Sequence, residues 1–265
     1  MPSLLHLRQT GRRLTIVLDD PRRQNALSAE MVGEIEGALE AAPPALAALV
    51  IEGANGVFSA GADLKSLSAA LEKSPEPGEV DPLEALNAAG GRFFARFAAL
   101  PFVTIAAVDG PAVGGGMGLA AAADIVVATQ RARFALSETS LGIPPAQIAP
   151  HLVARLGERI ARRLALTGAR LDGREAAALG LADFYCDSDA ERAAKLEALL
   201  ASVERCAPGA NAEVKRLFRA CQTQTSDAYI ETAAKSFTEA LRGSEGREGM
   251  SAFMEKRPPS WTRGV

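Results

Sequence analysis

Two runs of small residues are the part of this sequence whose residue types could do chemistry. They are residues 58–65 (FSAGADLK) and residues 109–118 (DGPAVGGGMG), and each comes where an apolar stretch stops. Small residues let a ligand approach backbone N–H groups closely, because no Cβ or only a methyl group stands in the way. Two such N–H groups directed at one oxygen would form an oxyanion hole, which favours reactions that build negative charge on a carbonyl. The pair therefore indicates chemistry on an acyl group.

The elements expected to position these runs alternate between strands and helices. Apolar stretches predict strands at residues 14–18, 47–51, 103–108 and 124–128, and helices at 29–39, 92–100 and 117–123. This alternation predicts an α/β arrangement for the first half of the chain. From residue 151 onward the pattern is almost wholly helical, with candidates at 152–156, 160–166, 174–179, 190–205, 210–221 and 225–241. Residues 72–82 collect Pro, Glu, Asp and Gly, and this composition predicts a loop.

Composition narrows the classes of protein and partner. The chain has 265 residues, of which 48% are hydrophobic, and this is enough for a large buried core. A net charge of -3, with 5% aromatic residues and no run of Lys or Arg, argues against a nucleic-acid partner. No stretch approaches the ~20 consecutive apolar residues of a membrane span, and the N-terminus lacks the apolar region of a signal peptide.

The remaining chemistry-bearing residues predict neither a metal site nor a covalent nucleophile. Cys186, Cys206 and Cys221 lie far apart without CxxC spacing, which is typical of reduced thiols in a cytoplasmic protein. No cluster of His, Cys and Asp has the spacing of metal ligands, so no metal is expected. The GxSxG motif of serine hydrolases is also absent from the sequence.

Seven segments in order resemble the crotonase, or enoyl-CoA hydratase/isomerase, superfamily and span nearly the whole chain. They are residues 20–28 (DPRRQNALS), 58–65 (FSAGADLK), 110–116 (GPAVGGG), 135–144 (ALSETSLGIP), 166–168 (LTG), 176–183 (AAALGLAD) and 252–257 (AFMEKR). The resemblance implies an α/β fold in which ββα units form a spiral. It places this core, with the coenzyme A site and the active site, in residues 1–195. Residues 196–265 would form a helical region that makes homotrimers or dimers of trimers.

The resemblance also assigns catalytic positions. Ala62 and Gly115 stand where the family donates its two oxyanion-hole N–H groups to the thioester oxygen. Glu138 matches the position of a catalytic glutamate, and apolar residues surround it in the sequence. A carboxylate in an apolar pocket has a raised pKa and can pass protons near neutral pH.

The substrate implied by the resemblance is a coenzyme A thioester, with no permanently bound cofactor. Three basic residues would meet the phosphates, and Phe253 would pack near the nucleotide from a neighbouring subunit. Asp63 and Leu64 would shape the adenine side of the pocket, with Ala26 and Ala60 in the same wall. The basic residues are Arg22, Lys65 and Lys256.

One departure from the family pattern bears on the reaction. Typical hydratases carry a second glutamate where this chain has Gly118, and residues 145–150 (PAQIAP) replace the usual glycine-rich start of the next helix. Both features resemble a subgroup that acts on branched glutaconyl-CoA esters, such as 3-methylglutaconyl-CoA or isohexenylglutaconyl-CoA. Such substrates carry a second carboxylate, which Gln147 or His151 could contact. The predicted substrate pocket thus contains Gly118, Leu141, Gln147 and His151.

Several functions remain open at this stage. The leading hypothesis is an enoyl-CoA hydratase of the branched or glutaconyl type. A Δ3,Δ2-enoyl-CoA isomerase is an alternative, because one glutamate can remove and return the same proton. Decarboxylation of a carboxylated acyl-CoA is another alternative, and a non-catalytic CoA-binding protein is the fourth.

Overall fold

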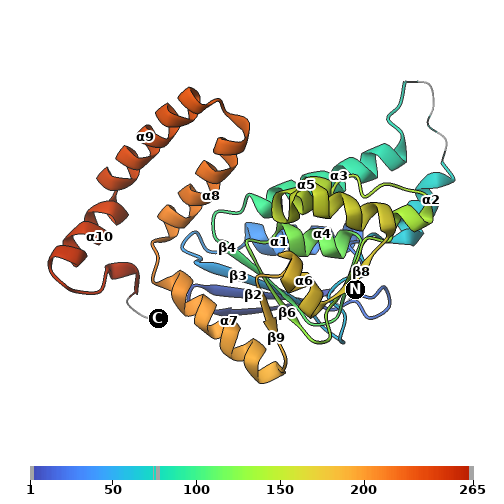
Figure 1. Ribbon diagram of the computed structural model, residues 1–265, viewed down its shortest axis with the longest axis horizontal. Helices are drawn as coiled ribbons and strands as arrows, with labels where there is room; N and C mark the ends of the chain where they lie inside the picture. The colour runs from blue at the N-terminus through green and yellow to red at the C-terminus, as the bar shows by residue number, and fades with distance from the viewer. Residues whose placement is uncertain (1–2, 74, 76–77, 263–265) are drawn as a thin grey trace.

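A computed structural model describes residues 3–73, 75 and 78–262 of the chain (Figure 1). The strands are β1 Leu5–Thr10, β2 Arg13–Leu18, β3 Ala48–Gly53, β4 Val103–Val108, β5 Pro111–Val113, β6 Ile125–Thr129, β7 Arg133–Ala135, β8 Arg170–Asp172 and β9 Phe184–Cys186. The helices are α1 Ala29–Glu40, α2 Leu64–Leu71, α3 Pro82–Ala98, α4 Gly115–Ala122, α5 Ala149–Thr167, α6 Gly173–Leu179, α7 Asp189–Glu204, α8 Pro208–Thr223, α9 Ser226–Arg242 and α10 Ser244–Met254. Two short 3-10 helices are η1 Glu138–Leu141 and η2 Ser260–Thr262.

The strands form two sheets, and most neighbouring strands run parallel. The larger sheet has the order β1-β2-β3-β4-β6-β9, in which β1 and β2 are antiparallel and every later pair is parallel. The smaller sheet has the order β5-β7-β8, with β5 parallel to β7. The predicted α/β fold with a helical C-terminal region is therefore confirmed.

The larger sheet has an apolar core on each face, because side chains alternate along a strand. In β4, Ala106 and Val108 contribute to the core that α3 and α4 cover. Ile105 and Ala107 point the other way, into a smaller core shared with Leu200 of α7. Figure 1 shows α7 on one side of the sheet and α3, α4 and α5 on the other. The site-bearing segments lie on the α3 and α4 side.

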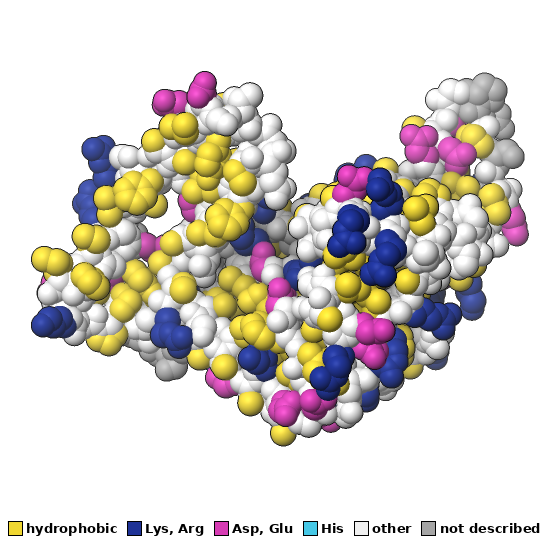
Figure 2. Space-filling model, viewed as in Figure 1, with side chains coloured by type: hydrophobic (Ala, Val, Ile, Leu, Met, Phe, Trp, Pro, Cys, Tyr) yellow, Lys and Arg dark blue, Asp and Glu magenta, His cyan; other side chains and the backbone are white. Residues whose placement is uncertain are grey.

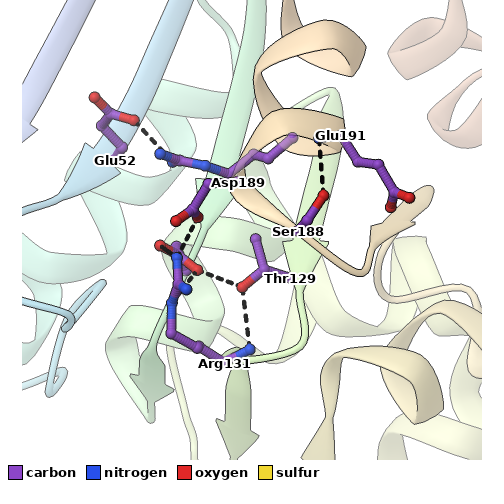
Figure 3. A network of polar contacts seen from close by, with 8 residues as sticks. Glu52, Thr129, Arg131, Ser188, Asp189 and Glu191 are labelled. Carbon is purple, nitrogen blue, oxygen red and sulfur yellow. Dashed lines mark hydrogen bonds and ion pairs between the residues drawn. The ribbon is translucent and has the colours of Figure 1, made fainter.

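A network of ion pairs fixes α7 against the larger sheet (Figure 3). Arg131 holds the Asp109 carboxylate at 2.5 Å and also contacts Asp189 at the start of α7. Arg192 donates to Glu52 of β3 at 3.1 Å. Arg131 thus engages both carboxylate oxygens of Asp109, so Asp109 at the head of the second small-residue run contributes to structure.

Two predicted boundaries were wrong. The helix expected at 92–100 begins at Pro82, where Asp81 accepts a hydrogen bond from the Leu83 N–H at 2.7 Å. An Asp cap followed by Pro at the first helical position is a helix start, although this stretch was expected to be a loop. The two short helices expected at 152–156 and 160–166 form one element, α5, interrupted at Gly157 with φ 71°.

The last three helices form an arm beside the α/β core. Figure 1 shows α9 and α10 at one end of the molecule and α2 at the other. Lys215 of α8 anchors the arm, since its Nζ donates to Asp124 at 2.7 Å and to the Phe102 carbonyl at 3.0 Å. The predicted division at residue 195 falls inside α7, which still packs on the sheet. The separate oligomerisation region stays a prediction.

Two further observations concern the environment of the chain. Among the residues that the structure describes, no helix is long and apolar enough to cross a membrane. Cys186 is buried, Cys206 and Cys221 are exposed, and all three are free thiols. The cytoplasmic location stays a prediction.

Candidate active site

A cavity of about 390 Å³ lies between α1, α2, α3 and the segment from η1 to the start of α5. Ala62, Gly115 and Glu138, the three residues expected to act in catalysis, all line it. They come from three segments that are far apart in the sequence. Most of the remaining lining is apolar, so the cavity suits an acyl group.

Direct backbone packing holds the two small-residue runs together. A Cβ on Gly61, whose φ is +87°, would lie 2.3 Å from the Val113 carbonyl oxygen. A Cβ on Gly116 would lie 2.3 Å from the Ser59 carbonyl oxygen. The Val113 N–H donates to that same Ser59 oxygen at 2.9 Å. Glycine is required at both positions because any side chain would force the two segments apart.

This packing leaves two backbone N–H groups free at the cavity. Ala62 follows Gly61, and Gly115 is the first residue of α4. A Cβ on Gly115 would lie 3.6 Å from the Ala62 nitrogen, which measures how close the two segments come. Within the described part of the chain, neither the Ala62 N–H nor the Gly115 N–H donates to a protein acceptor. Both can therefore donate to a ligand oxygen.

Glu138 brings a carboxylate into the same cavity. It begins η1, directly after β7 and the buried Leu136. Its Oε2 atom is buried and has no hydrogen-bond partner among the described residues. Burial raises the pKa of Glu138, because desolvation disfavours the charged form. A carboxyl in this setting can accept and return protons near neutral pH.

Gly114 makes room for Glu138, and the sequence patterns did not single it out for this. Its φ is +52°, and a Cβ there would lie 2.9 Å from Glu138 Oε1. The Gly114 N–H donates to the Ala135 carbonyl at 2.9 Å and so fixes the two segments beside one another. The signal available in the sequence was its position directly before Gly115, the predicted oxyanion-hole donor.

Gly118 lies behind the cavity wall, and Ile148 fills the space that a side chain would need. A Cβ on Gly118 would lie 2.1 Å from Ile148 Cγ2 and 2.7 Å from Ile148 Cβ. Ile148 itself lines the cavity. The place where the resemblance predicts the second acid of typical hydratases is thus occupied here by a β-branched apolar side chain.

The other predicted pocket residues divide into one that lines the cavity and two that lie outside the lining. Gln147 lines it, and its Nε2 donates to Oδ1 of Asn87 in α3 at 2.6 Å. His151 lies against Phe94 with the ring centres 6.1 Å apart, and burial lowers its pKa. Leu141 is 60% exposed to solvent.

The predicted coenzyme A residues lie mostly at the surface beside Ala62. Asp63 lines the cavity and caps α2 by accepting from the Lys65 N–H at 3.2 Å. Leu64 and Lys65 are exposed in the first turn of α2. The loop that carries Arg22 and Ala26 is tied to the first run, because the Ala60 N–H donates to the Gln24 carbonyl at 2.9 Å.

Phe253 and Lys256 lie on the arm, far from the cavity of their own chain. Figure 1 places α10 at the opposite end of the molecule from α2. Phe253 is 80% exposed, and Lys256 follows α10 with φ 54°. Neither residue lines the cavity of the single chain. The roles of all these residues stay predictions.

Comparison with known proteins identifies the family. The family model described as enoyl-CoA hydratase/isomerase matches residues 12–264. The chain belongs to the enoyl-CoA hydratase/isomerase family. The resemblance to the crotonase superfamily is thereby confirmed, and so is an enzyme with enoyl-CoA hydratase/isomerase-type activity.

Curated relatives cover almost the whole chain. A putative enoyl-CoA hydratase of Thermus thermophilus is 35% identical over 95% of this chain and 98% of its own length. The 2,3-dehydroadipyl-CoA hydratase of Escherichia coli is 32% identical over 98% of this chain and 99% of its own length.

Solved structures confirm the crotonase fold. An enoyl-CoA hydratase/isomerase from Marinobacter aquaeolei has a TM-score of 0.93 and 38% identity, covering 98% of this chain and 99% of that one. AtuE of Pseudomonas aeruginosa has a TM-score of 0.92 and 42% identity, covering 98% of this chain and 100% of that one.

Replacing Glu138 tests its role in proton transfer. We expect Glu138→Gln to lower kcat by about 10²–10⁴-fold while acyl-CoA binding persists, because the amide cannot exchange the proton. The wild-type rate should fall as the pH drops through the raised pKa of Glu138, since the carboxylate is the proton acceptor. The variant should lack this dependence. Glu158→Gln, on the exposed side of α5, is the control, and unchanged turnover of Glu138→Gln would contradict the assignment.

A second prediction concerns the contact between Gly118 and Ile148. Gly118→Ala should lower the free energy of unfolding by about 1–3 kcal/mol, because the new methyl overlaps Ile148. Gly37→Ala in α1 is the matched control, since a Cβ there meets nothing within 4 Å. In urea unfolding, Gly118→Ala combined with Ile148→Ala should lose less than the sum of the single variants. If Gly118→Ala and Gly37→Ala had the same free energy of unfolding, the contact between Gly118 and Ile148 would be absent.

Proposed function

We propose that the enzyme hydrates an α,β-unsaturated acyl-CoA thioester of the branched or glutaconyl type, such as 3-methylglutaconyl-CoA or isohexenylglutaconyl-CoA. The observation that carries this proposal is the cavity wall around Gly118. Ile148 fills the place of the second acid, and beside it stand the amides of Gln147 and Asn87. Neutral amides can donate hydrogen bonds to a substrate carboxylate without repelling it.

Two further observations support a substrate with a branch or a second carboxylate. The apolar cavity of about 390 Å³ is roomy enough for a branched acyl group. One relative is named as the hydratase of 2,3-dehydroadipyl-CoA, the thioester of a dicarboxylic acid.

In the proposed mechanism, the Ala62 and Gly115 N–H groups form an oxyanion hole. They hold the thioester oxygen and stabilise the enolate that forms when water attacks the β-carbon. A single donor of this kind is typically worth about 3 kcal/mol of barrier. Glu138 takes a proton from the attacking water and then delivers that proton to the α-carbon, so the carboxylate is regenerated at the end of the cycle. The substrate carboxylate, held by Gln147 and Asn87, helps to position the water.

Isomerisation of a Δ3 to a Δ2 thioester is the second candidate function. Glu138 is the one carboxylate of the described cavity lining whose buried oxygen has no partner. A single group can take the proton from the α-carbon and return it at the γ-carbon. The same oxyanion hole would stabilise the dienolate formed between these steps.

A substrate panel separates the two reactions. Hydration of a 2-enoyl or glutaconyl thioester should decrease the absorbance of the conjugated thioester, whereas isomerisation of a 3-enoyl thioester should increase it. We expect Gln147→Ala and Asn87→Ala to lower kcat/KM about 10-fold on glutaconyl thioesters, because each loses a hydrogen bond to a charged group. The same variants should change kcat/KM less than about 2-fold on unbranched enoyl thioesters.

His151→Ala serves as the comparison variant, because His151 lies behind Phe94 and not in the lining. It should affect both substrate classes less than Gln147→Ala does. Equal effects of Gln147→Ala on the two classes, or hydration of unbranched thioesters alone, would overturn the substrate assignment.

We also propose that the enzyme is a homotrimer or a dimer of trimers, joined through residues 196–265. Figure 2 shows apolar side chains across the α8–α10 arm. Phe218, Phe237 and Phe253 are 66%, 69% and 80% exposed in the single chain. Large apolar side chains exposed together on one region of a chain are typical of a protein interface. In such an assembly, Phe253 and Lys256 would reach a neighbour's nucleotide.

The oligomer is tested by placing charge on the arm. Phe218→Asp combined with Phe237→Asp should reduce the mass measured by light scattering to that of a monomer, because burying the new charges is costly. Lys235→Asp on α9 changes a residue whose side chain is 78% exposed and should leave the mass unchanged. A wild-type chain that is already monomeric at micromolar concentration would contradict the proposal.

A further inference from the structure

The cavity continues past the catalytic residues along one side of α1. Leu27 is joined to Ala62 by a β-bridge, so α1 starts beside the proposed oxyanion hole. The cavity is then lined by Ala29, Val32 and Gly33, and it reaches Glu36. Glu36 lies seven positions after Ala29 in the helix, which corresponds to a rise of about 10 Å along the helix axis.

An ion pair crosses the cavity at this far end. Arg96 in the last turn of α3 donates through Nη2 to Glu36 Oε1 of α1, and both residues line the cavity. Their side chains are 59% and 30% exposed, so the pair stands between the cavity and solvent. On the α3 side, the wall leading to it is formed by Phe93 and Phe94.

The part of the substrate that extends toward this pair is the acyl chain. The lining between Ala29 and Glu36 is apolar, which favours hydrocarbon. The phosphates of coenzyme A would be repelled by Glu36, and the predicted phosphate-binding residues Arg22 and Lys65 are exposed outside the lining.

We propose that the Glu36–Arg96 ion pair is a gate that sets the acyl length the enzyme accepts. An extended chain covers about 3.5 Å in three bonds, so about nine bonds fill the 10 Å from the catalytic end. Shorter acyl groups fit with the pair closed. Longer groups must separate the two side chains to pass between α1 and α3. Because exposed ion pairs are weak, the gate discriminates by about 2- to 5-fold and does not exclude long chains.

The test measures kcat/KM for 2-enoyl thioesters of four, six, ten and twelve carbons. Arg96→Ala and Glu36→Ala should each raise the ratio of long-chain to short-chain kcat/KM by about 2- to 5-fold. The exchange Glu36→Arg with Arg96→Glu re-forms a pair and should return the ratio toward the wild-type value. High salt should raise the ratio in the wild type, because it screens exposed charges, and not in Arg96→Ala.

Arg162→Ala is the matched control, because Arg162 makes an exposed ion pair with Glu158 on α5. It should leave the ratio unchanged. An unchanged ratio in Arg96→Ala, or an equal change for all chain lengths, would overturn the gate.

The inference rests on acyl-CoA binding by this family and is independent of the branched or glutaconyl substrate. Should no hydration be detected, the Kd values of saturated acyl-CoA thioesters of the same lengths replace kcat/KM. Length-dependent binding that changes in Arg96→Ala would support the gate even where the proposed reaction fails.

Discussion

The contact between two stretches of backbone is the constraint on which the site depends. Gly61 touches the Val113 carbonyl and Gly116 touches the Ser59 carbonyl, each at a distance that leaves no space for a Cβ. Because main-chain atoms meet directly, the N–H groups of Ala62 and Gly115 are placed by rigid elements rather than by side-chain rotamers. Backbone donors held in this way need no reorganisation when negative charge develops on a bound oxygen.

The same close packing determines the electrostatics around Glu138. Gly114 gives the carboxylate its space, and the surrounding apolar residues remove it from water. The cost of burying a charge then appears as the raised pKa of Glu138. A fully partnered carboxylate would be more stable as an anion and a weaker proton acceptor. The Oε2 atom, which has no partner among the described residues, is thus a local cost to stability that would suit Glu138 to its proposed role as a proton acceptor.

The sequence predicted the features that local residue patterns specify, and it did not predict the features that depend on contacts between distant residues. The strand at residues 103–108 and the two small-residue runs were predicted because propensity and glycine spacing are local. The start of α3 was missed because the Pro, Glu, Asp and Gly content of residues 72–82 is typical of a loop, and the helix cap at Asp81 was not recognised within it. Gly118 was recognised as a departure, but the filling of its space by Ile148 joins residues 30 positions apart, with no spacing rule to indicate it. The Glu36–Arg96 pair joins two helices 60 positions apart in the same way.

The choice between adding water and moving a double bond depends on the wall opposite Glu138. Both reactions need one proton acceptor and a stabilised enolate, but hydration also needs a water held against the β-carbon. Ile148 cannot hold water, whereas a substrate carboxylate bound by the Gln147–Asn87 amide pair can position it, and the amides themselves do not titrate. Under the proposed hydratase mechanism, Glu138 would therefore be the group of the described cavity lining that imposes a pH dependence on the chemical step. A substrate carboxylate beside the amides would take over the polar role of the second glutamate that this chain lacks. The absence of that glutamate is thereby linked to a substrate that carries its own carboxylate.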